Sequence, residues 1–500
     1  MTALARCVMV QGTASGVGKS VVATALCRVL RDAGFRVAPF KAQNMSLNAA
    51  VTPAGEEIGR AQAAQAEAAG IDARATMNPI LLKPEGESRS QLVVLGRARG
   101  SVAAREYWTR RSALWPVVTG ALTGLRREFE VVVIEGAGSP AEVNLRRTEI
   151  ANMRVALASD AAVLLVADIS PGGVFAQVLG TLDLLRKRER ALVRGVIVNK
   201  FRGDRALFSS GVRFLRRASG IPVLGVLPYL DDMPVPSEDS LSLDAPARDG
   251  LLDVAVLRYP RVSNFDEFSA LAGAGARVRF VKRARDLGVP DLVILPGSKA
   301  TIPDLEWLRA SGLAARVVAL VDAGVPVLGI CAGFQMLGRE LADPAGVEGP
   351  AMRVRGLGLL PARTVFAAAK RTVSVRGRVS HGGMFERLAA AEFTGYELHL
   401  GATTRDGAPH FAELEVEKEA RRVRDGAVSA DGRVIGTYVH GLFASAAVRE
   451  AILVQLAARR GIAFTPRTLV ADRYAVLADW FCGAIDTRRL LRAAGLERRG

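Results

Sequence analysis

Short apolar runs alternate with segments of helical spacing along most of the chain. The runs VVVIEGAG at 131–138, AVLLVADI at 162–169 and GVIVNKF at 195–201 have the length of buried strands. Such alternation is typical of βαβ units, in which helices connect parallel strands and cover the sheet. The sequence therefore predicts the α/β fold class.

The alternation is interrupted near residue 231. Residues 231–250 read DDMPVPSEDSLSLDAPARDG, an acidic stretch rich in proline and serine that indicates a linker. A second α/β series follows, becomes strand-rich between about 355 and 439, and ends in a helical stretch. We expect these units: an N-terminal domain at 1–230, a linker at 231–250, a second domain at 251–450 and a C-terminal helical segment at 451–500. Within the last segment, core positions at helical spacing are Tyr474, Leu477, Phe481 and Ile485.

Composition narrows the class of protein only a little. The formal net charge of +17 suggests nucleic-acid binding, but the basic residues are spread along the chain without an aromatic-interleaved stripe. No apolar run has the length of a membrane span, and the first residues do not have the pattern of a signal peptide. We therefore expect a cytoplasmic protein with neither nucleic acid nor a membrane as partner, and the oligomeric state stays open between a monomer and a homo-oligomer.

The four cysteines lie far apart in the sequence. Cys7, Cys27, Cys331 and Cys482 form no CxxC pair, which argues against a zinc site and a disulfide framework. Unpaired cysteines of this kind fit a reducing compartment.

The strongest local motif is GTASGVGKS at 12–20, between a strand-like run and a helix-like segment. Glycines let backbone N–H groups surround a phosphate, a lysine neutralises phosphate oxygens, and the serine hydroxyl can bind Mg²⁺. Five residues separate Gly12 from Gly18, one more than in the common P-loop. The alternative is a glycine-rich turn with a chance GKS. The predicted nucleotide-binding residues here are Gly12, Thr13, Gly16, Val17, Gly18, Lys19 and Ser20.

Polar residues end the strand-like runs that follow. Glu135 ends one run and is a candidate Mg²⁺ ligand beside Ser20, either directly or through water. Asp168 ends the next run, where open α/β sheets bind ligands, although a simple strand-terminating role is an equal alternative. Asn199 and Lys200 end a third run, and the Asn199 amide could read a purine edge.

The second candidate site lies in GICAGF at 329–334. A G-x-C-x-G turn between a strand and a helix resembles a nucleophile elbow, which exposes Cys331 and places its thiolate at a helix N-terminus. The Ala332 amide can then contribute to an oxyanion hole. Free cysteines are also commonly buried hydrophobes, so the turn alone leaves both interpretations open.

A nucleophilic cysteine needs a base, and the chain has four histidines. His440 follows the strand-like VIGTYV and opens a loop, whereas His399 lies within a strand pattern. We therefore predict a Cys331–His440 pair, with backbone amides around Gly297 in LPGSKAT as a second oxyanion donor. Such a pair suits attack on a carboxamide and acyl transfer through a thioester.

Several motifs together resemble the cobyric acid synthases, glutamine-dependent amidotransferases of cobalamin biosynthesis. The motifs are GTASGVGKS, PFKAQNMSLN, MNPILLKP, IEGAGSPAEVNL, VNKFRGD, VSNFDEF, LPGSKAT, GICAGFQMLG and TYVHGLF, and they span nearly the whole chain. The resemblance implies an N-terminal P-loop domain like that of dethiobiotin synthetase and a C-terminal class I glutamine amidotransferase domain.

The resemblance also implies a two-site reaction. Cys331 and His440 release ammonia from glutamine, and ATP with Mg²⁺ converts a corrinoid carboxylate to an acyl phosphate that ammonia attacks. In the family this amidates the b, d, e and g carboxylates of adenosylcobyrinic acid a,c-diamide. Lys41, Gln43 and Asn44, together with Asp168, are expected near the substrate or the transferred phosphoryl group.

Several positions depart from the family pattern, among them Leu442, Ser170 and Pro171 after VADI, Ala332 in GICAGF and Leu47 in NMSLN, and two alternatives remain. Class I enzymes usually carry a glutamate two residues after the histidine, where this chain has Leu442, so the group that orients His440 is not identified. The close alternative is the a,c-diamide synthase of the same pathway or another amidoligase with these domains. A nucleotide-switch ATPase is the alternative from a different class, and it leaves Cys331 and His440 without a task.

Overall fold

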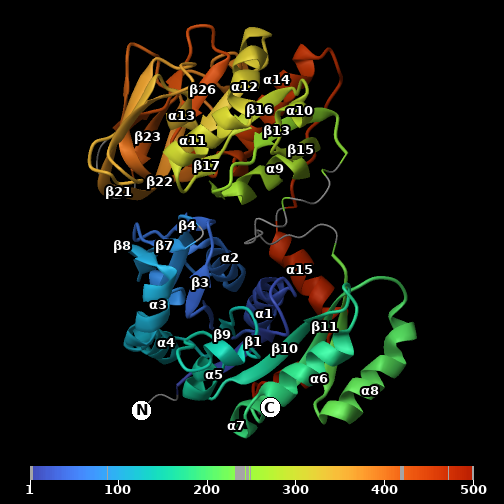
Figure 1. Cartoon of the computed structure of the whole chain (residues 1–500). Coiled ribbons are helices and arrows are strands. Elements are labelled where there is room, and N and C mark those ends of the chain that lie inside the picture. The colour runs from blue at the N-terminus through green and yellow to red at the C-terminus, as the bar shows by residue number, and fades with distance from the viewer. Residues whose placement is uncertain are drawn as a thin grey trace.

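The computed structural model describes residues 4–86, 88–230, 243, 247, 249–416, 422–470 and 472–497. Two α/β domains lie one above the other, with the N-terminal domain in blue to green below and the second domain in yellow to orange above (Figure 1). The predicted linker at 231–250 lies outside the described residues except for Leu243, Ala247, Asp249 and Gly250.

The N-terminal domain is built on a parallel sheet of six strands, in the order β12-β11-β10-β1-β9-β2. These strands are β1 (Arg6–Gly12), β2 (Val37–Phe40), β9 (Val131–Glu135), β10 (Ala162–Asp168), β11 (Val193–Phe201) and β12 (Val223–Pro228). They are apolar and almost entirely buried, as expected for a parallel sheet covered on both faces. The predicted α/β fold class is confirmed.

Helices cover both faces of this sheet. One face packs against α1 (Lys19–Asp32) and the other against α4 (Trp115–Glu128), α5 (Met153–Ser159), α6 (Val174–Leu184) and α8 (Ser209–Ser219). The helix α2 (Arg60–Ala69) contacts α1 and β2 and lies at the side of the sheet that faces the second domain (Figure 1).

A smaller layer lies between this sheet and the second domain. It contains the four-stranded sheet β3 (Gln43–Met45), β6 (Ile80–Pro84), β7 (Arg89–Val94) and β8 (Arg97–Ala103), and the hairpin β4 (Ala49–Val51) with β5 (Glu57–Gly59). The PFKAQNMSLN motif therefore leads from the N-terminal domain into the region between the domains (Figure 1).

The second domain combines two sheets. The first has the order β15-β13-β16-β18-β26-β25, in which only β25 is antiparallel to its neighbour. Its strands are β13 (Leu252–Leu257), β15 (Ala276–Val281), β16 (Leu292–Leu295), β18 (Val327–Ile330), β25 (Ala427–Val428) and β26 (Val434–Thr437). Helices packed on it include α11 (Thr301–Ala310), α12 (Leu313–Asp322), α13 (Ala332–Leu337) and α14 (Ala446–Arg459).

The second sheet is mainly antiparallel and confirms the strand-rich pattern before residue 439. It contains β19 (Glu340–Asp343), β20 (Met352–Arg355), β21 (Ala362–Val379), β22 (Glu392–Arg405), β23 (Ala412–Val416), β24 (Arg422–Asp425) and β27 (Val439–His440). Its edge strand β27 pairs with β22, with His440 opposite Tyr396. His440 therefore lies at the edge of this sheet.

The C-terminal stretch is divided between the two domains. Helix α14 packs into the core of the second domain, whereas α15 (Arg473–Cys482) and α16 (Thr487–Ala493) return to the N-terminal domain, where α15 packs against α1 and α16 contacts β11. The four predicted core residues Tyr474, Leu477, Phe481 and Ile485 are all buried there. The expected 451–500 segment is thus not a separate unit in the structure.

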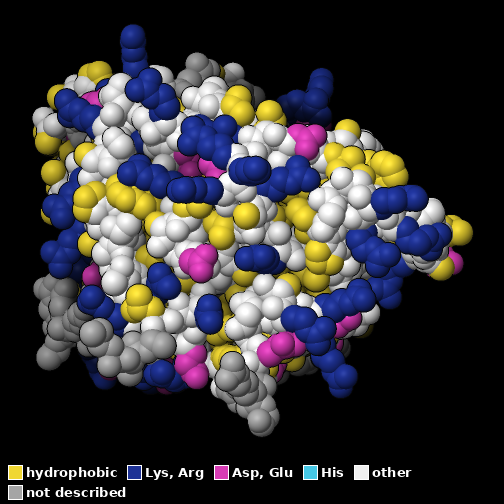
Figure 2. Space-filling view, turned by 90° about the horizontal axis from the view of Figure 1, so that it is seen from below, with side chains coloured by type: hydrophobic (Ala, Val, Ile, Leu, Met, Phe, Trp, Pro, Cys, Tyr) yellow, Lys and Arg dark blue, Asp and Glu magenta, His cyan; other side chains and the backbone are white. Residues whose placement is uncertain are grey.

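Basic side chains are dispersed over the lower face of the molecule, among acidic and hydrophobic ones (Figure 2). Within the part of the chain that is described, no helix combines the length and the apolarity needed to cross a membrane. Three of the four free cysteines are buried and Cys482 is exposed.

Candidate active sites

Cys331 lies on a strained turn between β18 and α13. Its φ of 54° and ψ of −109° are unusual for a residue with a side chain, as expected for a nucleophile elbow. The glycine at 333 is required because a Cβ there would lie 1.9 Å from the Leu295 carbonyl oxygen. Cys331 is only 6% exposed, so it is both buried and held on the elbow.

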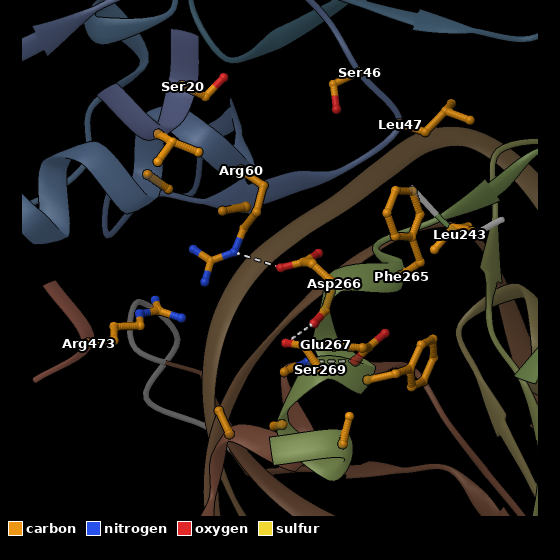
Figure 3. A pocket seen from close by; sticks show the side chains of 18 of the residues that line it. Ser20, Ser46, Leu47, Arg60, Leu243, Phe265, Asp266, Glu267, Ser269 and Arg473 are labelled. Atoms are coloured by element: carbon orange, nitrogen blue, oxygen red, sulfur yellow. Dashed lines mark hydrogen bonds and ion pairs between the residues drawn. The ribbon is translucent and has the colours of Figure 1, made fainter. Parts of the chain in front are cut away.

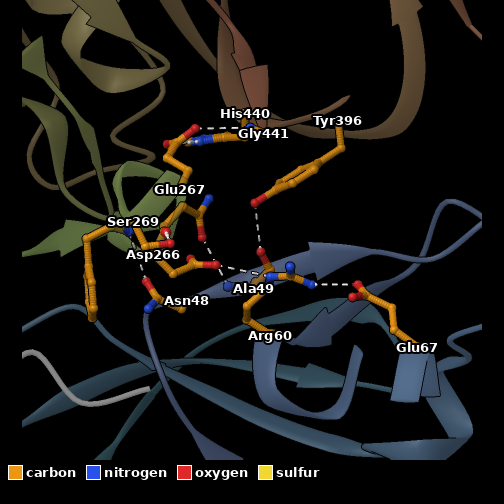
Figure 4. A network of polar contacts seen from close by, with 12 residues as sticks. Asn48, Ala49, Arg60, Glu67, Asp266, Glu267, Ser269, Tyr396, His440 and Gly441 are labelled. Carbon is orange, nitrogen blue, oxygen red and sulfur yellow. Dashed lines mark hydrogen bonds and ion pairs between the residues drawn. The ribbon is translucent and has the colours of Figure 1, made fainter. Parts of the chain in front are cut away.

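His440 is oriented by a carboxylate that the sequence interpretation missed. Glu267 Oε1 lies 3.0 Å from His440 Nδ1, and its Oε2 accepts a hydrogen bond from the Gly441 amide at 3.0 Å (Figure 4). Glu267 belongs to the short 3-10 helix Phe265–Phe268 in the VSNFDEF motif, 173 positions before the histidine. The usual glutamate position after the histidine holds Leu442, which is fully buried.

The charge state of His440 follows from its neighbours. Burial lowers its pKa, but Glu267 and the Cys331 sulfur more than compensate and raise the pKa to about 10. Nδ1 donates to Glu267, and Nε2, which is buried, makes no hydrogen bond to the described residues. The Cys331 thiol contacts the Leu398 carbonyl oxygen at 3.6 Å.

The two predicted oxyanion donors belong to this site. Ala332 begins α13 directly after the nucleophile, and Gly297 lies against the imidazole, since a Cβ at 297 would be 3.0 Å from His440 Cε1. Gly297 pairs with Ser263 in a short antiparallel bridge, which ties LPGSKAT to VSNFDEF.

A small cavity of about 40 Å³ adjoins the cysteine and is shared by both domains. Its lining includes Cys331, Gln335 and His399 from the second domain and Lys83 from the N-terminal domain. Burial lowers the pKa of His399 to about 3, so its ring is neutral at physiological pH. Its Nδ1 donates to the Gly401 carbonyl at 3.1 Å, and its ring stacks on Tyr438.

The phosphate loop has the strand–loop–helix geometry that its sequence predicts. β1 ends at Gly12 and α1 begins at Lys19, with Gly16 and Gly18 at φ values of 70° and 99°. Lys19 Nζ donates to the carbonyl oxygens of Ala14 and Gly138, each at 2.9 Å. The Thr13 hydroxyl lies 3.3 Å from Gln177 Oε1. Within the loop, the Val17 side chain is buried.

Glu135 is the centre of a buried polar cluster beside this loop. Its Oε1 accepts hydrogen bonds from Ser20 Oγ and Lys41 Nζ, each at 2.8 Å, and its Oε2 accepts from Gln62 and Gln65 of α2 at 3.3 and 2.6 Å. Burial raises the pKa of Glu135, but Lys41 and these donors lower it below its ordinary value. An anionic carboxylate next to a serine hydroxyl is a donor set that suits Mg²⁺.

The residues at the end of β10 and β11 support the phosphate loop. Asn199 Nδ2 donates to the Val17 carbonyl at 2.8 Å, and Lys200 Nζ donates to the Gly16 carbonyl at 2.7 Å. Asp168 pairs with Lys200 at 2.7 Å, so it anchors that lysine.

Of the four residues predicted near the substrate or the transferred phosphoryl group, two line the large cavity between the domains and two do not. Lys41 and Asn44 line a large cavity, and Asn44 also donates to Gln62 at 3.0 Å. Gln43 instead accepts a hydrogen bond from Tyr107 at 2.6 Å. Asp168 is bonded to Lys200 and Ser170.

The large cavity lies between the domains, and residues of both domains line it, although Cys331 and His440 are not among them. Its volume is about 2610 Å³, well above the range of about 300–1,000 Å³ that is usual for small-ligand sites. Lys19, Ser20 and Glu135 line one end, and Glu267 and Gly441 line the other. Figure 3 shows Ser20 and Arg60 on one side of this space and Asp266 with Glu267 on the other.

Two known domain families match this chain, one over each of its domains. Residues 8–242 match the family described as the CobQ/CobB/MinD/ParA nucleotide binding domain, and residues 253–448 match the CobB/CobQ-like glutamine amidotransferase domain. The chain therefore joins a nucleotide-binding domain to a glutamine amidotransferase domain, which confirms the predicted architecture.

Individual relatives define the family more closely. The chain is 48% identical over 508 residues to the cobyric acid synthase of Moorella thermoacetica, covering 99% of this chain and 98% of that protein. It is also 48% identical over 525 residues to the cobyric acid synthase of Sorangium cellulosum, with full coverage of both. The chain belongs to the cobyric acid synthase family and is a glutamine-dependent amide-forming ligase of cobalamin biosynthesis.

Proposed function

We propose that this enzyme amidates the b, d, e and g carboxylates of adenosylcobyrinic acid a,c-diamide to give adenosylcobyric acid, with glutamine as the nitrogen donor and ATP as the activating substrate. The observation that carries the proposal is the large cavity between the domains, whose lining includes the phosphate loop and Glu267, the carboxylate bonded to His440. Its volume exceeds what a nucleotide alone needs and leaves room for a corrinoid.

The glutaminase half begins with attack of the Cys331 sulfur on the side-chain carboxamide of glutamine. A C–S bond forms, His440 gives its Nε2 proton to the leaving nitrogen, and the C–N bond breaks to release ammonia. His440 then takes a proton from water, which hydrolyses the thioester to glutamate. Glu267 holds the imidazole through Nδ1, and we expect the Ala332 and Gly297 amides beside it to stabilise the oxyanion.

The synthetase half activates a carboxylate that has no leaving group. One carboxylate oxygen of the corrinoid attacks the terminal phosphorus of ATP, ADP leaves, and ammonia displaces phosphate from the acyl phosphate. The phosphate loop and Lys19 bind the phosphates, and Lys41 beside Glu135 is placed to offset developing charge. Ser20 and Glu135 would hold Mg²⁺, which offsets the charge of the phosphate oxygens when bound.

Because the lining of the large cavity extends from the phosphate loop to Glu267 and Gly441, we expect ammonia to pass directly from one site to the other. Ammonia released into bulk water becomes protonated and loses its nucleophilic lone pair, so a sheltered path preserves it. We expect the reaction to take place in the cytoplasm, which suits the four free cysteines.

Mass spectrometry of the product tests the proposal. Purified enzyme is incubated with the adenosylated a,c-diamide, ATP and glutamine, and each OH-to-NH₂ exchange lowers the mass by about 1 Da. Four successive losses are expected. No amidation of this substrate, together with conversion of cobyrinic acid to its diamide, would instead identify the a,c-diamide synthase.

A further inference from the structure

The C-terminal stretch of the chain lies outside both matched domain families. The second match ends at residue 448, whereas the alignments with the two cobyric acid synthases cover 99% and 100% of the chain. The chain therefore shares this stretch with whole cobyric acid synthases, and the chemistry of the two domain families does not account for it. Within it, residues 467–470 and 472–480 include several that line the large cavity, and we call this segment the C-terminal wall.

The two ends of the C-terminal wall are fixed to different domains. The Arg467 amide donates to the Ala274 carbonyl of the second domain at 3.0 Å. At the other end, Trp480 Nε1 donates to the Pro228 carbonyl of the N-terminal domain at 3.1 Å. Figure 1 shows α15, which forms most of the wall, between the second domain and the N-terminal sheet. The wall therefore has a defined position at the side of the cavity.

Helix α15 carries two different stripes of side chains. Tyr474, Leu477 and Phe481 are buried in the core of the N-terminal domain. Arg473 and Val476, three positions apart, line the cavity instead. Because Val476 is apolar and yet 47% exposed, this second stripe does not serve the core.

Further exposed apolar side chains line the same cavity. Val470 of the C-terminal wall is 65% exposed, and Met45 in the PFKAQNMSLN motif is 60% exposed and lines the cavity from the N-terminal domain. Exposed apolar side chains in a concave site are typical of a surface that binds an apolar ligand. A corrin ring has this character, because methyl groups cover much of its faces and its carboxylates lie on side chains at its periphery.

Arg467 adds a positive charge to the C-terminal wall. Its side chain is exposed, lines the cavity and makes no hydrogen bond or ion pair with the residues that the structure describes. Arg473, which Figure 3 shows at the side of this space, instead pairs with Glu67 at 2.8 Å. A guanidinium group binds a carboxylate through two parallel hydrogen bonds, so Arg467 is suited to an anionic group of the ligand.

We propose that the C-terminal wall recognises the corrinoid substrate. Val470 and Val476 contact the apolar face of the ring, and Arg467 binds a peripheral carboxylate other than the one being activated. Activation takes place at the phosphate loop of the N-terminal domain, whereas Arg467 is anchored to the second domain, so the two positions hold different carboxylates of one substrate. The proposal rests on the proposed function, because it takes the a,c-diamide as the ligand.

Equilibrium binding of adenosylcobyrinic acid a,c-diamide tests the proposal. The enzyme is mixed with the corrinoid, Mg²⁺ and a non-hydrolysable ATP analogue, without glutamine, so that no amidation occurs. Ultrafiltration separates free from bound corrinoid, and the visible absorbance of the filtrate gives the Kd. The Kd of the ATP analogue is measured on the same preparations.

The charged contact is tested at Arg467. Arg467→Gln should raise the Kd of the corrinoid by about tenfold to 100-fold, the range for loss of a hydrogen bond to a charged group, and Arg467→Lys should recover part of the affinity. Arg277→Gln is the matched control, because Arg277 is also exposed on the second domain but is not among the described residues that line the cavity. An unchanged Kd in Arg467→Gln, or an equal rise in Arg277→Gln, would overturn the assignment.

The apolar contact is tested at the two valines. Val470→Ser and Val476→Ser should each raise the Kd by about threefold to tenfold, because each removes part of an apolar surface that the ring covers. Val289→Ser is the matched control, since Val289 is 73% exposed and is not among the described cavity residues. Melting temperatures should match the wild type, because the substituted side chains are exposed. A wild-type Kd in both wall variants would contradict the ring contact.

Two further outcomes separate this proposal from its neighbours. If the wall variants bind the ATP analogue more weakly but the corrinoid with the wild-type Kd, the wall belongs to the nucleotide site and the proposal is wrong. If the wild-type enzyme neither binds nor amidates the a,c-diamide, the proposed function is wrong as well. Wild-type binding and amidation that persist unchanged in every wall variant would overturn the role of the wall alone.

Discussion

The candidate nucleotide site takes its groups from strands of one parallel sheet, whereas the candidate glutaminase site assembles three distant segments. Gly12, Glu135 and Asn199 meet because parallel strands present their carboxyl ends at one edge. Cys331 lies after β18, but His440 comes from the edge of a second sheet and Glu267 from a short helix that the N-terminal domain holds in place. Domain contacts should therefore affect glutamine hydrolysis more than nucleotide binding.

The largest effect on activity is expected when the nucleophile of the glutaminase site is replaced. Cys331→Ser should lower glutamine-dependent amidation by about 10³-fold or more, because a serine hydroxyl is not ionised beside His440. Amidation with high ammonium should continue, since the nucleotide site is intact. Product formation with each nitrogen source provides the measurement, and loss of both activities in a folded variant would rule out two separable sites.

The corresponding substitution in the phosphate loop is Lys19→Ala. Removing the phosphate-binding amine should lower amidation by about 10²- to 10³-fold with either nitrogen source, as expected for loss of one charge-stabilising donor. Basal glutamine hydrolysis should remain measurable. Assays of amide product and of glutamate on the same preparation check this, and unchanged amidation would refute the assignment of the phosphate loop.

Glu267→Gln tests the carboxylate that crosses the domain boundary. It should lower the glutaminase kcat by about 10²-fold with a smaller change in the glutamine KM, because the imidazolium loses its ionic partner. Amidation with ammonium should be retained. Wild-type kcat with this variant would show that His440 does not depend on Glu267.

The pH profile of the same pair sharpens the comparison. The pKa of His440 is lowered by burial but raised overall to about 10 by Glu267 and Cys331, above the ordinary value of about 6.5. Its contribution to folding stability is therefore complete below about pH 6.5 and is lost as the pH rises toward 10. Glutaminase activity should fall over the same alkaline pH range, as His440 loses its proton. In the Glu267→Gln variant this fall in activity should occur at lower pH. If the wild-type enzyme and the Glu267→Gln variant lost activity over the same alkaline pH range, Glu267 would not be what raises the pKa of His440.

The smallest effect is expected at the nucleotide site. Asn199→Ala removes the hydrogen bond to the Val17 carbonyl, which costs about 1–3 kcal/mol for a buried acceptor left without a partner. The KM for ATP should rise by about tenfold while glutamine hydrolysis stays near wild type. Kinetics with varied ATP provide the check, and a changed glutamine KM with an unchanged ATP KM would be inconsistent with this role.

Local motifs predicted the fold and most of the nucleotide site. The strand, loop and helix around Lys19 and the carboxylate at Glu135 appear in the structure as the apolar runs and glycines indicate. Gln62 and Gln65 were missed, because nothing in the sequence of α2 shows that its polar side chains face a carboxylate 70 or more positions away.

The glutaminase site was predicted less completely. The turn at Cys331 was visible because glycines bracket it, and His440 was chosen among four histidines by its place after a strand. Glu267 could not be assigned, because the usual position holds Leu442 and no spacing rule connects residues 173 positions apart. The VSNFDEF motif was the one available signal, and it identified the segment without its role.

The sequence by itself determined those features that depend on local chemistry: the α/β pattern, the phosphate loop, the elbow at Cys331 and the family resemblance. Only the tertiary structure decided which carboxylate orients His440, that α15 and α16 return to the N-terminal domain, and that α2 contacts both Glu135 and Asp266 of the second domain. The reason is physical. Glycine conformations and hydrophobic periodicity act over a few residues, whereas a buried ion pair requires two segments to meet, and packing of the whole chain decides which segments do.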